Sequence, residues 1–264
     1  MGCLKLHILD KQYKRTELRV SYFNKKLTQS FCADNLRRWT LVSRIDPDGR
    51  ADFWFDGRMI GNDGIDDQRI MALKTTEKSF SEGEHKVDGA GLSRKDQKAT
   101  VNFIKANSGN AEAFQKNGMA YTNSVAIESS ATNRQAMIKE VSRDDGRGGT
   151  SDANNREYGG SIQNGNVVAA EPGPVSNPAV GGASIMLPTG YPKYHGHPSG
   201  TRSESVEGGT RNSSFNQPPS PTDINNAGGY TNYVFGRGDG MVYIYNSTGV
   251  QAVIPMQYFV NPRR

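Results

Sequence analysis

Two histidines stand two residues apart in the segment His195-Gly196-His197-Pro198. On a β-strand, residues i and i+2 point to the same side, so both imidazoles can reach one metal ion. Zinc sites that hydrolyse bonds use three protein ligands and leave the fourth position for water. A third ligand is therefore needed, and Asp223 in the segment Ser220-Pro221-Thr222-Asp223 is the candidate.

A carboxylate beside such an ion would complete a hydrolytic centre. Bound zinc lowers the pKa of water to about 7, which makes hydroxide available at neutral pH. A neighbouring carboxylate can take the proton of that water and later pass it to a leaving amine. Two upstream residues compete for this role: Glu157, which precedes Tyr158-Gly159-Gly160-Ser161, and Glu171, which precedes the turn Pro172-Gly173-Pro174.

The order of these elements resembles the signature of the JAMM (MPN) zinc metallopeptidases. That signature has an upstream Glu, then His-x-His-Pro, then Ser-x-x-Asp. The segment Glu157-Tyr158-Gly159-Gly160 looks like the Glu-x-Gly-Gly start of the first strand in prokaryotic JAMM domains, which favours Glu157 over Glu171. The resemblance covers about half of the chain, roughly residues 130–264.

The resemblance implies a role for each of these side chains. His195, His197 and Asp223 would bind zinc, Glu157 would activate the water, and Ser220 would help to polarise the scissile carbonyl. The implied activity is that of a zinc metallopeptidase, a peptidase or isopeptidase that acts on a protein or peptide substrate.

The chain departs from the family pattern in two places. Gly196 stands between the histidines, where Ser or Thr is usual, and it is expected to point away from the metal. The gap between His197 and Ser220 is longer than usual. Glu204 and Glu207 lie within that gap and are alternatives to Asp223 as the third ligand.

Among JAMM proteins, the match resembles the JAB-like toxin domains of bacterial polymorphic toxins, especially those of Bacteroidetes. The opening Met1-Gly2-Cys3-Leu4-Lys5-Leu6 looks like the start of short RHS-associated proteins from the same bacteria. The resemblance implies a toxin or effector domain, with an immunity protein as a partner.

Two other function classes compete with this interpretation. A non-catalytic binding module that keeps the JAMM fold is the main alternative, although it would not need an intact Glu157 and three ligands. A zinc deaminase requires His-x-Glu and a later Pro-Cys-x-x-Cys. The chain has only Cys3 and Cys32, which we expect to be free thiols, so the deaminase class is excluded.

Composition and charge argue against membrane and nucleic-acid functions. No apolar run approaches eighteen residues, and the N-terminus lacks the apolar stretch of a signal peptide. We therefore expect a cytoplasmic protein, or one exported by a device other than a signal peptide. The net charge is +5, but residues 151–264 carry seven basic and seven acidic side chains. The basic excess is scattered before residue 151 and forms no concentrated face for nucleic acid.

The elements that must position the site form an α/β or α+β pattern, with a layered mixed sheet flanked by helices. Asp56-Gly57 predicts a hairpin within residues 52–60, and residues 62–67 are acid-rich and predict a solvated turn. Capping and periodicity predict helices over 93–106 and 130–142, separated from the next strand by a loop over 143–155. The later segments are expected as follows: strands at 161–162 and 167–170 around Asn164-Gly165, a strand at 183–187, a long loop at 199–219, a helix at 221–227, and strands at 233–235, 241–245 and 249–256.

These elements predict that the chain consists of two parts. Residues 1–90 are turn-rich, with a turn at 46–49, and are expected to connect to a delivery system. Residues 91–264 are expected to form the JAB-like domain, with the zinc core in 150–264. The alternative is that residues 1–90 pack on the catalytic part as additional core.

Overall fold

The computed structural model describes residues 50–66, 69–82 and 85–262. The predictions for Cys3, Cys32, the opening segment and the turn at 46–49 lie outside these residues. The fold is a mixed α+β arrangement, as the sequence predicts. In the described part of the chain, no helix has both the length and the apolar character needed to cross a membrane.

The first sheet has four strands in the order β2-β1-β3-β6. β1 (Arg50–Phe55) and β2 (Arg58–Asp66) form the predicted hairpin, with positive φ angles at both turn residues, Asp56 and Gly57. β3 (Ile70–Leu73) runs parallel to β1, and β6 (Ser124–Ala126) pairs antiparallel with β3. This sheet therefore combines the segment before residue 90 with a strand from the middle of the chain.

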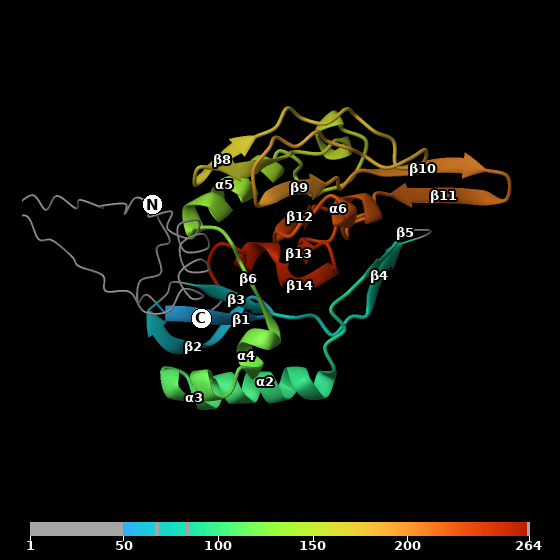
Figure 1. The fold of residues 1–264 in the computed structure, drawn as a ribbon. Coiled ribbons are helices and arrows are strands. Elements are labelled where there is room, and N and C mark those ends of the chain that lie inside the picture. The colour runs from blue at the N-terminus through green and yellow to red at the C-terminus, as the bar shows by residue number, and fades with distance from the viewer. Residues whose placement is uncertain (1–49, 67–68, 83–84, 263–264) are drawn as a thin grey trace, which may run out of the picture. The chain divides into compact units, whose positions relative to one another are not determined.

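Three helices cover the outer face of the first sheet (Figure 1). They are α2 (Arg94–Ala106), α3 (Ala111–Lys116) and α4 (Met119–Thr122). Ser93 caps α2 as predicted, since its hydroxyl accepts a hydrogen bond from the backbone N–H of Asp96 at 3.0 Å. Ile104 of α2 is fully buried against this sheet.

The predicted solvated turn at 62–67 is wrong, because β2 continues to Asp66. Asp63 is fully buried, and its carboxylate accepts hydrogen bonds from the backbone N–H of Ile65 and from the hydroxyl of Tyr121, at 2.8 and 2.6 Å. A buried acid is tolerated when such donors satisfy it. Tyr121 lies 58 residues away in sequence, so the local acidic composition gave no sign of this partner.

The second sheet has six strands in the order β14-β13-β12-β9-β7-β8. The pairing of β12 with β9 is parallel, and every other pairing in this sheet is antiparallel. The predicted hairpin at Asn164-Gly165 and the predicted strand at 249–256 are confirmed. The strands are β7 (Gly159–Gln163), β8 (Asn166–Ala169), β9 (Lys193–His197), β12 (Asn232–Gly236), β13 (Met241–Asn246) and β14 (Gly249–Pro255).

The main core lies on one face of this second sheet. Tyr194, Tyr233 and Phe235 from its central strands pack with Met137 of α5 (Ala131–Val141), the helix predicted at 130–142. Trp54 of the first sheet belongs to the same buried cluster. The opposite face carries a smaller cluster, which leaves room there for a functional site.

The described strands before residue 90 share this core with the later elements. Trp54 and Ala72 are buried with residues of β12 and β14, and the described residues from Arg50 onward belong to one compact unit. A role of the segment 1–90 in delivery stays a prediction. In its packing, however, the described part of that segment belongs with the rest of the unit.

Two segments around the site differ from the sequence prediction. Residues 183–187 form no strand but belong to an irregular segment, in which the side chain of Met186 is 91% exposed. The predicted loop at 199–219 contains an exposed hairpin of β10 (Thr201–Val206) and β11 (Gly209–Ser214), which extends away from the second sheet (Figure 1). Both of its faces are polar, so alternating hydrophobicity could not reveal it.

The remaining elements are short. They are β4 (Ser79–Glu82) and β5 (His85–Asp88), which form a two-stranded sheet, α6 (Pro221–Asn225) at the predicted helix, and two 3-10 helices, η1 (Asp152–Asn155) and η2 (Met256–Tyr258). η1 lies within the segment 143–155 that the sequence predicts as a loop.

Candidate metal centre

β9 presents both histidines on the face of the sheet opposite the main core. Tyr194 points into that core, and His195 and His197 point the other way, as alternation along a strand requires. The two Nε2 atoms lie 3.2 Å apart, and both side chains are at least nine-tenths buried. Gly196 contacts α5: an added Cβ would lie 3.2 Å from Cβ of Val141, so a small residue suits this position.

Asp223 reaches the histidines from the first turn of α6. Ser220 is the N-cap of this helix, and its hydroxyl accepts a hydrogen bond from the backbone N–H of Asp223 at 3.2 Å. In return, the backbone N–H and the hydroxyl of Ser220 both donate to Oδ2 of Asp223 at 2.7 Å. This capping box fixes the carboxylate with Oδ1 3.3 Å from Nε2 of His195 and Oδ2 3.5 Å from Nε2 of His197.

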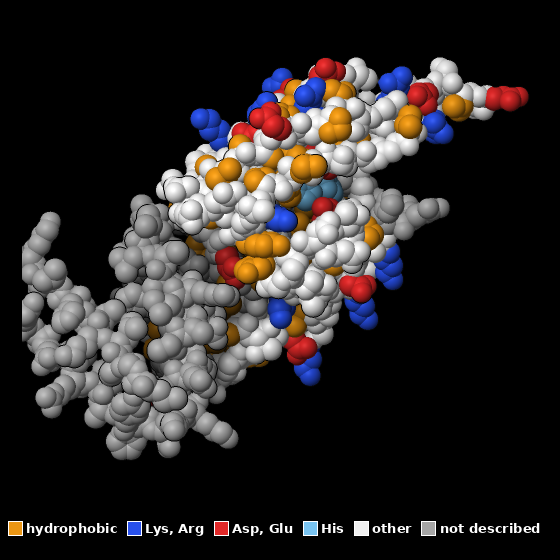
Figure 2. Space-filling model, turned by 45° about the horizontal axis from the view of Figure 1, so that its top comes forward, with side chains coloured by type: hydrophobic (Ala, Val, Ile, Leu, Met, Phe, Trp, Pro, Cys, Tyr) orange, Lys and Arg blue, Asp and Glu red, His pale blue; other side chains and the backbone are white. Residues whose placement is uncertain are grey.

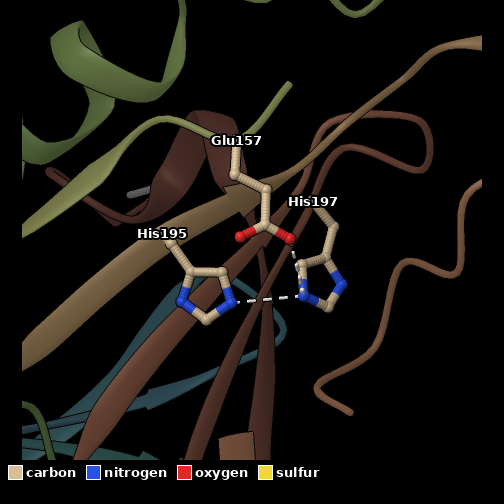
Figure 3. A group of neighbouring side chains, drawn as sticks. All are labelled: Glu157, His195 and His197. Atoms are coloured by element: carbon tan, nitrogen blue, oxygen red, sulfur yellow. Dashed lines mark hydrogen bonds and ion pairs between the residues drawn. The ribbon is translucent and has the colours of Figure 1, made fainter. Parts of the chain in front are cut away.

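Glu157 enters from the segment between η1 and β7. Its carboxylate is buried, and Oε1 lies 3.9 Å from Nε2 of His197 (Figure 3). The backbone around it is fixed on both sides, because Gly173 N–H donates to the carbonyl of Glu157 and Gly196 N–H donates to the carbonyl of Tyr158. The ligand atoms of Glu157, His195 and His197 all lie within 4.8 Å of one another.

This arrangement fits a divalent metal ion. Four ligands about 2.0–2.1 Å from a tetrahedral ion stand about 3.3–3.4 Å from one another. The two Nε2 atoms lie 3.2 Å apart. The Asp223 carboxylate meets the two imidazoles with different oxygens, Oδ1 at 3.3 Å from His195 and Oδ2 at 3.5 Å from His197. Glu157 lies farther from His197, which suits a residue that contacts a water beside the ion. Among the described residues, the cluster of Glu157, His195 and His197 could hold a metal ion. Asp223 is not in that cluster, although its two oxygens lie closer to the imidazoles than Glu157 does to His197.

The charges of the cluster are strongly coupled. Burial would by itself lower the pKa of His195, but the Asp223 carboxylate, with a further contribution from Glu157, raises it to about 9. Burial would likewise raise the pKa of Asp223, and the two histidines lower it well below its usual range. Without a metal, the centre thus favours a protonated His195 against an ionised Asp223. A metal ion would replace that proton.

Among the described residues, no group forms a hydrogen bond with the other ring nitrogen of either imidazole. Nδ1 of His195 and Nδ1 of His197 are buried and find no partner among the residues that the structure describes. Metal-binding histidines usually donate this N–H to a second group. Here the strand and its packing must hold the rings instead.

A pair of hydrogen bonds behind the site, between Asp144 and Ser199, was not predicted from the sequence. Asp144 is buried, and its carboxylate accepts hydrogen bonds from the backbone N–H and the hydroxyl of Ser199, at 2.7 and 2.6 Å. Ser199 follows His197 by two residues, so Asp144 fixes the chain where it leaves β9. The Asp144-Asp145-Gly146 segment is a turn signal that could have pointed to an anchoring role, although not to its partner.

The structure brings Glu157 to the histidines and does not bring the alternatives there. Glu171 is exposed and lies outside the cluster. Glu204 forms ion pairs with Arg202 and Arg211 on the β10–β11 hairpin, and Glu207 is exposed at the hairpin turn. The ligand and base roles of Asp223 and Glu157 stay predictions.

The cluster lies at the base of a cavity of about 760 Å³. Figure 2 shows the histidine side chains in a hollow bordered by hydrophobic side chains. The irregular segment that the sequence predicts as a strand contributes Ile185 and Leu187 to one wall. Lys193, Phe215 and Tyr245 line other parts of the cavity. The cavity is large enough for several residues of a peptide.

Comparison of the chain with family models, curated proteins and solved structures found no match in any of the three. The resemblance to the JAMM family therefore rests on the motif and its spacing alone.

Proposed function

We propose that this protein is a zinc-dependent peptidase or isopeptidase that hydrolyses an amide bond at the centre formed by Glu157, His195, His197 and Asp223. One observation carries the proposal: three segments far apart in sequence bring these four side chains into one cluster, with the two Nε2 atoms 3.2 Å apart and carboxylate oxygens 3.3–3.9 Å from them. An ordinary buried core would not gather two histidines and two carboxylates there, because burying such charges without a partner is costly.

Each side chain has a part in the proposed reaction. His195, His197 and Asp223 would hold the ion, which when bound supplies an acidified water and polarises the scissile carbonyl. Glu157, beside the cluster but farther from its centre, would take a proton from the attacking water. It would then pass this proton to the nitrogen of the leaving amine, which would depart as a neutral group.

Ser220 positions Asp223, and it would polarise the substrate carbonyl only after its hydroxyl turns away from Asp223. In the structure its hydroxyl proton is donated to Asp223, so it holds the third ligand in place. To polarise a carbonyl it would have to turn that proton toward the substrate. Its backbone N–H would continue to hold the Asp223 carboxylate meanwhile.

The test is cleavage by the zinc-loaded chain compared with its Glu157→Gln variant. Both proteins are expressed in cells, and the new termini are identified by proteomics. We expect new termini with the wild-type chain and none with Glu157→Gln, which should still bind zinc. Glu171→Gln is the matched control and should cleave like the wild type. Full activity in Glu157→Gln, with loss in Glu171→Gln, would transfer the base role to Glu171.

The role as a toxin or effector, with an immunity protein as partner, is proposed on the motif resemblance. The non-catalytic binding module is the competing outcome: it predicts zinc in the wild-type chain without any zinc-dependent cleavage.

A further inference from the structure

The cavity continues from the metal centre along β9 toward Lys193 and Tyr245. Lys193 precedes His195 by two residues and so projects from the same face of the sheet. Its backbone N–H donates to the side chain of Asn232 on β12 at 2.8 Å, and Asn232 pairs directly with Tyr245 on β13. Lys193 and Tyr245 thus flank Asn232 on the face that carries the histidines, and both line the cavity.

Lys193 brings an unpaired positive charge to this cavity. Within the part of the chain that the structure describes, it is the one Lys or Arg among the lining residues, and it forms no ion pair. Its ammonium lies 5.2 Å from the centre of the Tyr191 ring, which in turn stacks on Tyr230 with centroids 4.0 Å apart. Figure 2 shows a basic side chain and hydrophobic side chains next to the hollow that contains the histidines.

Tyr245 brings an unused hydrogen-bond donor. Its side chain is only 3% exposed, yet its hydroxyl makes no hydrogen bond with any residue that the structure describes. A phenol is neutral at pH 7 at its ordinary pKa of about 10, and burial together with the nearby carboxylates raises the pKa of Tyr245 further. Because Tyr245 lines the cavity, a ligand there could accept a hydrogen bond from this hydroxyl.

The charge balance of the cavity favours an anion at this place. Glu157 and Asp223 are the carboxylates that line it, and a divalent ion would balance their two charges. The charge of Lys193 then remains, so this end of the cavity is positive. Together, a cation and a neutral donor suit a carboxylate.

We propose that Lys193 and Tyr245 form a subsite that binds a carboxylate of the substrate next to the scissile amide. This inference rests on the proposed function and names its substrate class: a peptide with an acidic side chain, or with a free terminal carboxylate, close to the cleaved bond. Positions i and i+2 of a strand are about 6.7 Å apart, which an extended peptide spans with about two residues. The carboxylate therefore belongs to a residue within about two positions of the scissile bond.

The test measures binding separately from cleavage. Zinc-loaded full chain carrying Glu157→Gln is titrated by calorimetry with three pentapeptides. Two are acetylated and amidated, with Glu or Gln at the centre, and the third is the Gln peptide with a free C-terminus. We expect either the Glu peptide or the free-acid peptide to bind about tenfold more tightly than the amidated Gln peptide, since hydrogen bonds to charged groups are the strong ones. Which of the two is preferred identifies the source of the carboxylate.

Adding Lys193→Met should abolish this preference, and adding Tyr245→Phe should reduce it, with zinc content unchanged in both. Lys193→Gln serves as a second variant if Lys193→Met is insoluble. Lys139→Met, at an exposed lysine of α5, is the matched control and should keep the preference. Equal affinity for all three peptides would overturn the inference. A preference that persists without Lys193 would do so as well, because the metal itself would then be binding the carboxylate.

The failure of this inference can be told from failure of the proposed function. A preference that depends on Lys193, in a protein that cleaves nothing, supports the subsite and refutes the peptidase. Zinc-dependent cleavage that ignores acidic residues supports the peptidase and refutes the subsite.

Discussion

The metal-free protein should lose stability as the pH rises from about 6.5 to about 9. The perturbation is removal of metal with a chelator, which leaves His195 facing Asp223. A histidine in an unfolded chain has a pKa of about 6.5, and the folded environment raises the pKa of His195 to about 9. Because the folded pKa is the higher one, the stabilisation is fully present below pH 6.5 and is lost as the pH passes 9.

The size of this effect follows from the two pKa values. Their difference corresponds to about 3 kcal/mol in the free energy of unfolding. For a protein of this length, that is a fall in Tm of about 6–12 °C. The lowered pKa of Asp223 arises from the same ion pair, so it adds no second contribution to this free energy. The stabilisation that depends on the ionised Asp223 is lost only at acid pH.

Differential scanning calorimetry of the chelator-treated chain between pH 6 and 9.5 measures this fall. Asp223→Asn is the control, because it removes the carboxylate that raises the pKa of His195, and its Tm should lack the same fall. Saturating zinc should also remove the dependence, since a coordinated imidazole carries no extra proton. A metal-free wild-type Tm that is flat or rises over this range, relative to Asp223→Asn, would refute the proposed coupling.

Three further predictions concern the surroundings of the site. Gly159→Ala should destabilise the protein by about 1–3 kcal/mol and weaken zinc binding, because the new Cβ would lie 2.7 Å from Cβ of His195; thermal unfolding and zinc titration measure both. Deleting the hairpin Thr201–Ser214 should change the peptide sequences cleaved in a peptide library more than it changes zinc content, because Pro198 and Phe215 on either side of the hairpin line the cavity. Removing residues 1–92 should give an insoluble or metal-free protein, because Trp54 leaves the main core.

Each of these predictions has its own contrary outcome. Gly181→Ala, where the new Cβ meets nothing within 4 Å, should behave like the wild type, and equal effects at the two glycines would remove the steric argument. Unchanged cleavage of every library peptide without the hairpin would make it a passive insertion. A soluble, zinc-binding and active chain that begins at Ser93 would instead support the connector interpretation of residues 1–90.

Local signals in the sequence were sufficient for several elements. Asn164-Gly165 is a hairpin dipeptide whose turn geometry needs positive φ, and both residues have it. The sequence pattern of a helix start is found at Ser220, Pro221 and Asp223. The structure has the corresponding capping box between Ser220 and Asp223. The His195-x-His197 spacing correctly predicted that both rings share one side of a strand.

What the sequence could not show depends on distant partners. Asp63 looks like a surface acid until Tyr121 is placed beside it. The hydrogen bonds between Asp144 and Ser199 join residues that are 55 positions apart in the sequence. Neither an aspartate nor a serine by itself indicates the position of such a partner. Lys193 and Tyr245 come together only through the order of the strands, which single-sequence patterns do not give.

The most direct test of the metal centre is the zinc content of the purified full chain. Elemental analysis after metal-replete purification should find one zinc per chain in the wild type. It should find almost none in His195→Ala, and an unchanged value in Asp152→Asn, an exposed acid outside the site. A wild-type chain without zinc, or a His195→Ala variant that keeps full occupancy, would contradict the central claim.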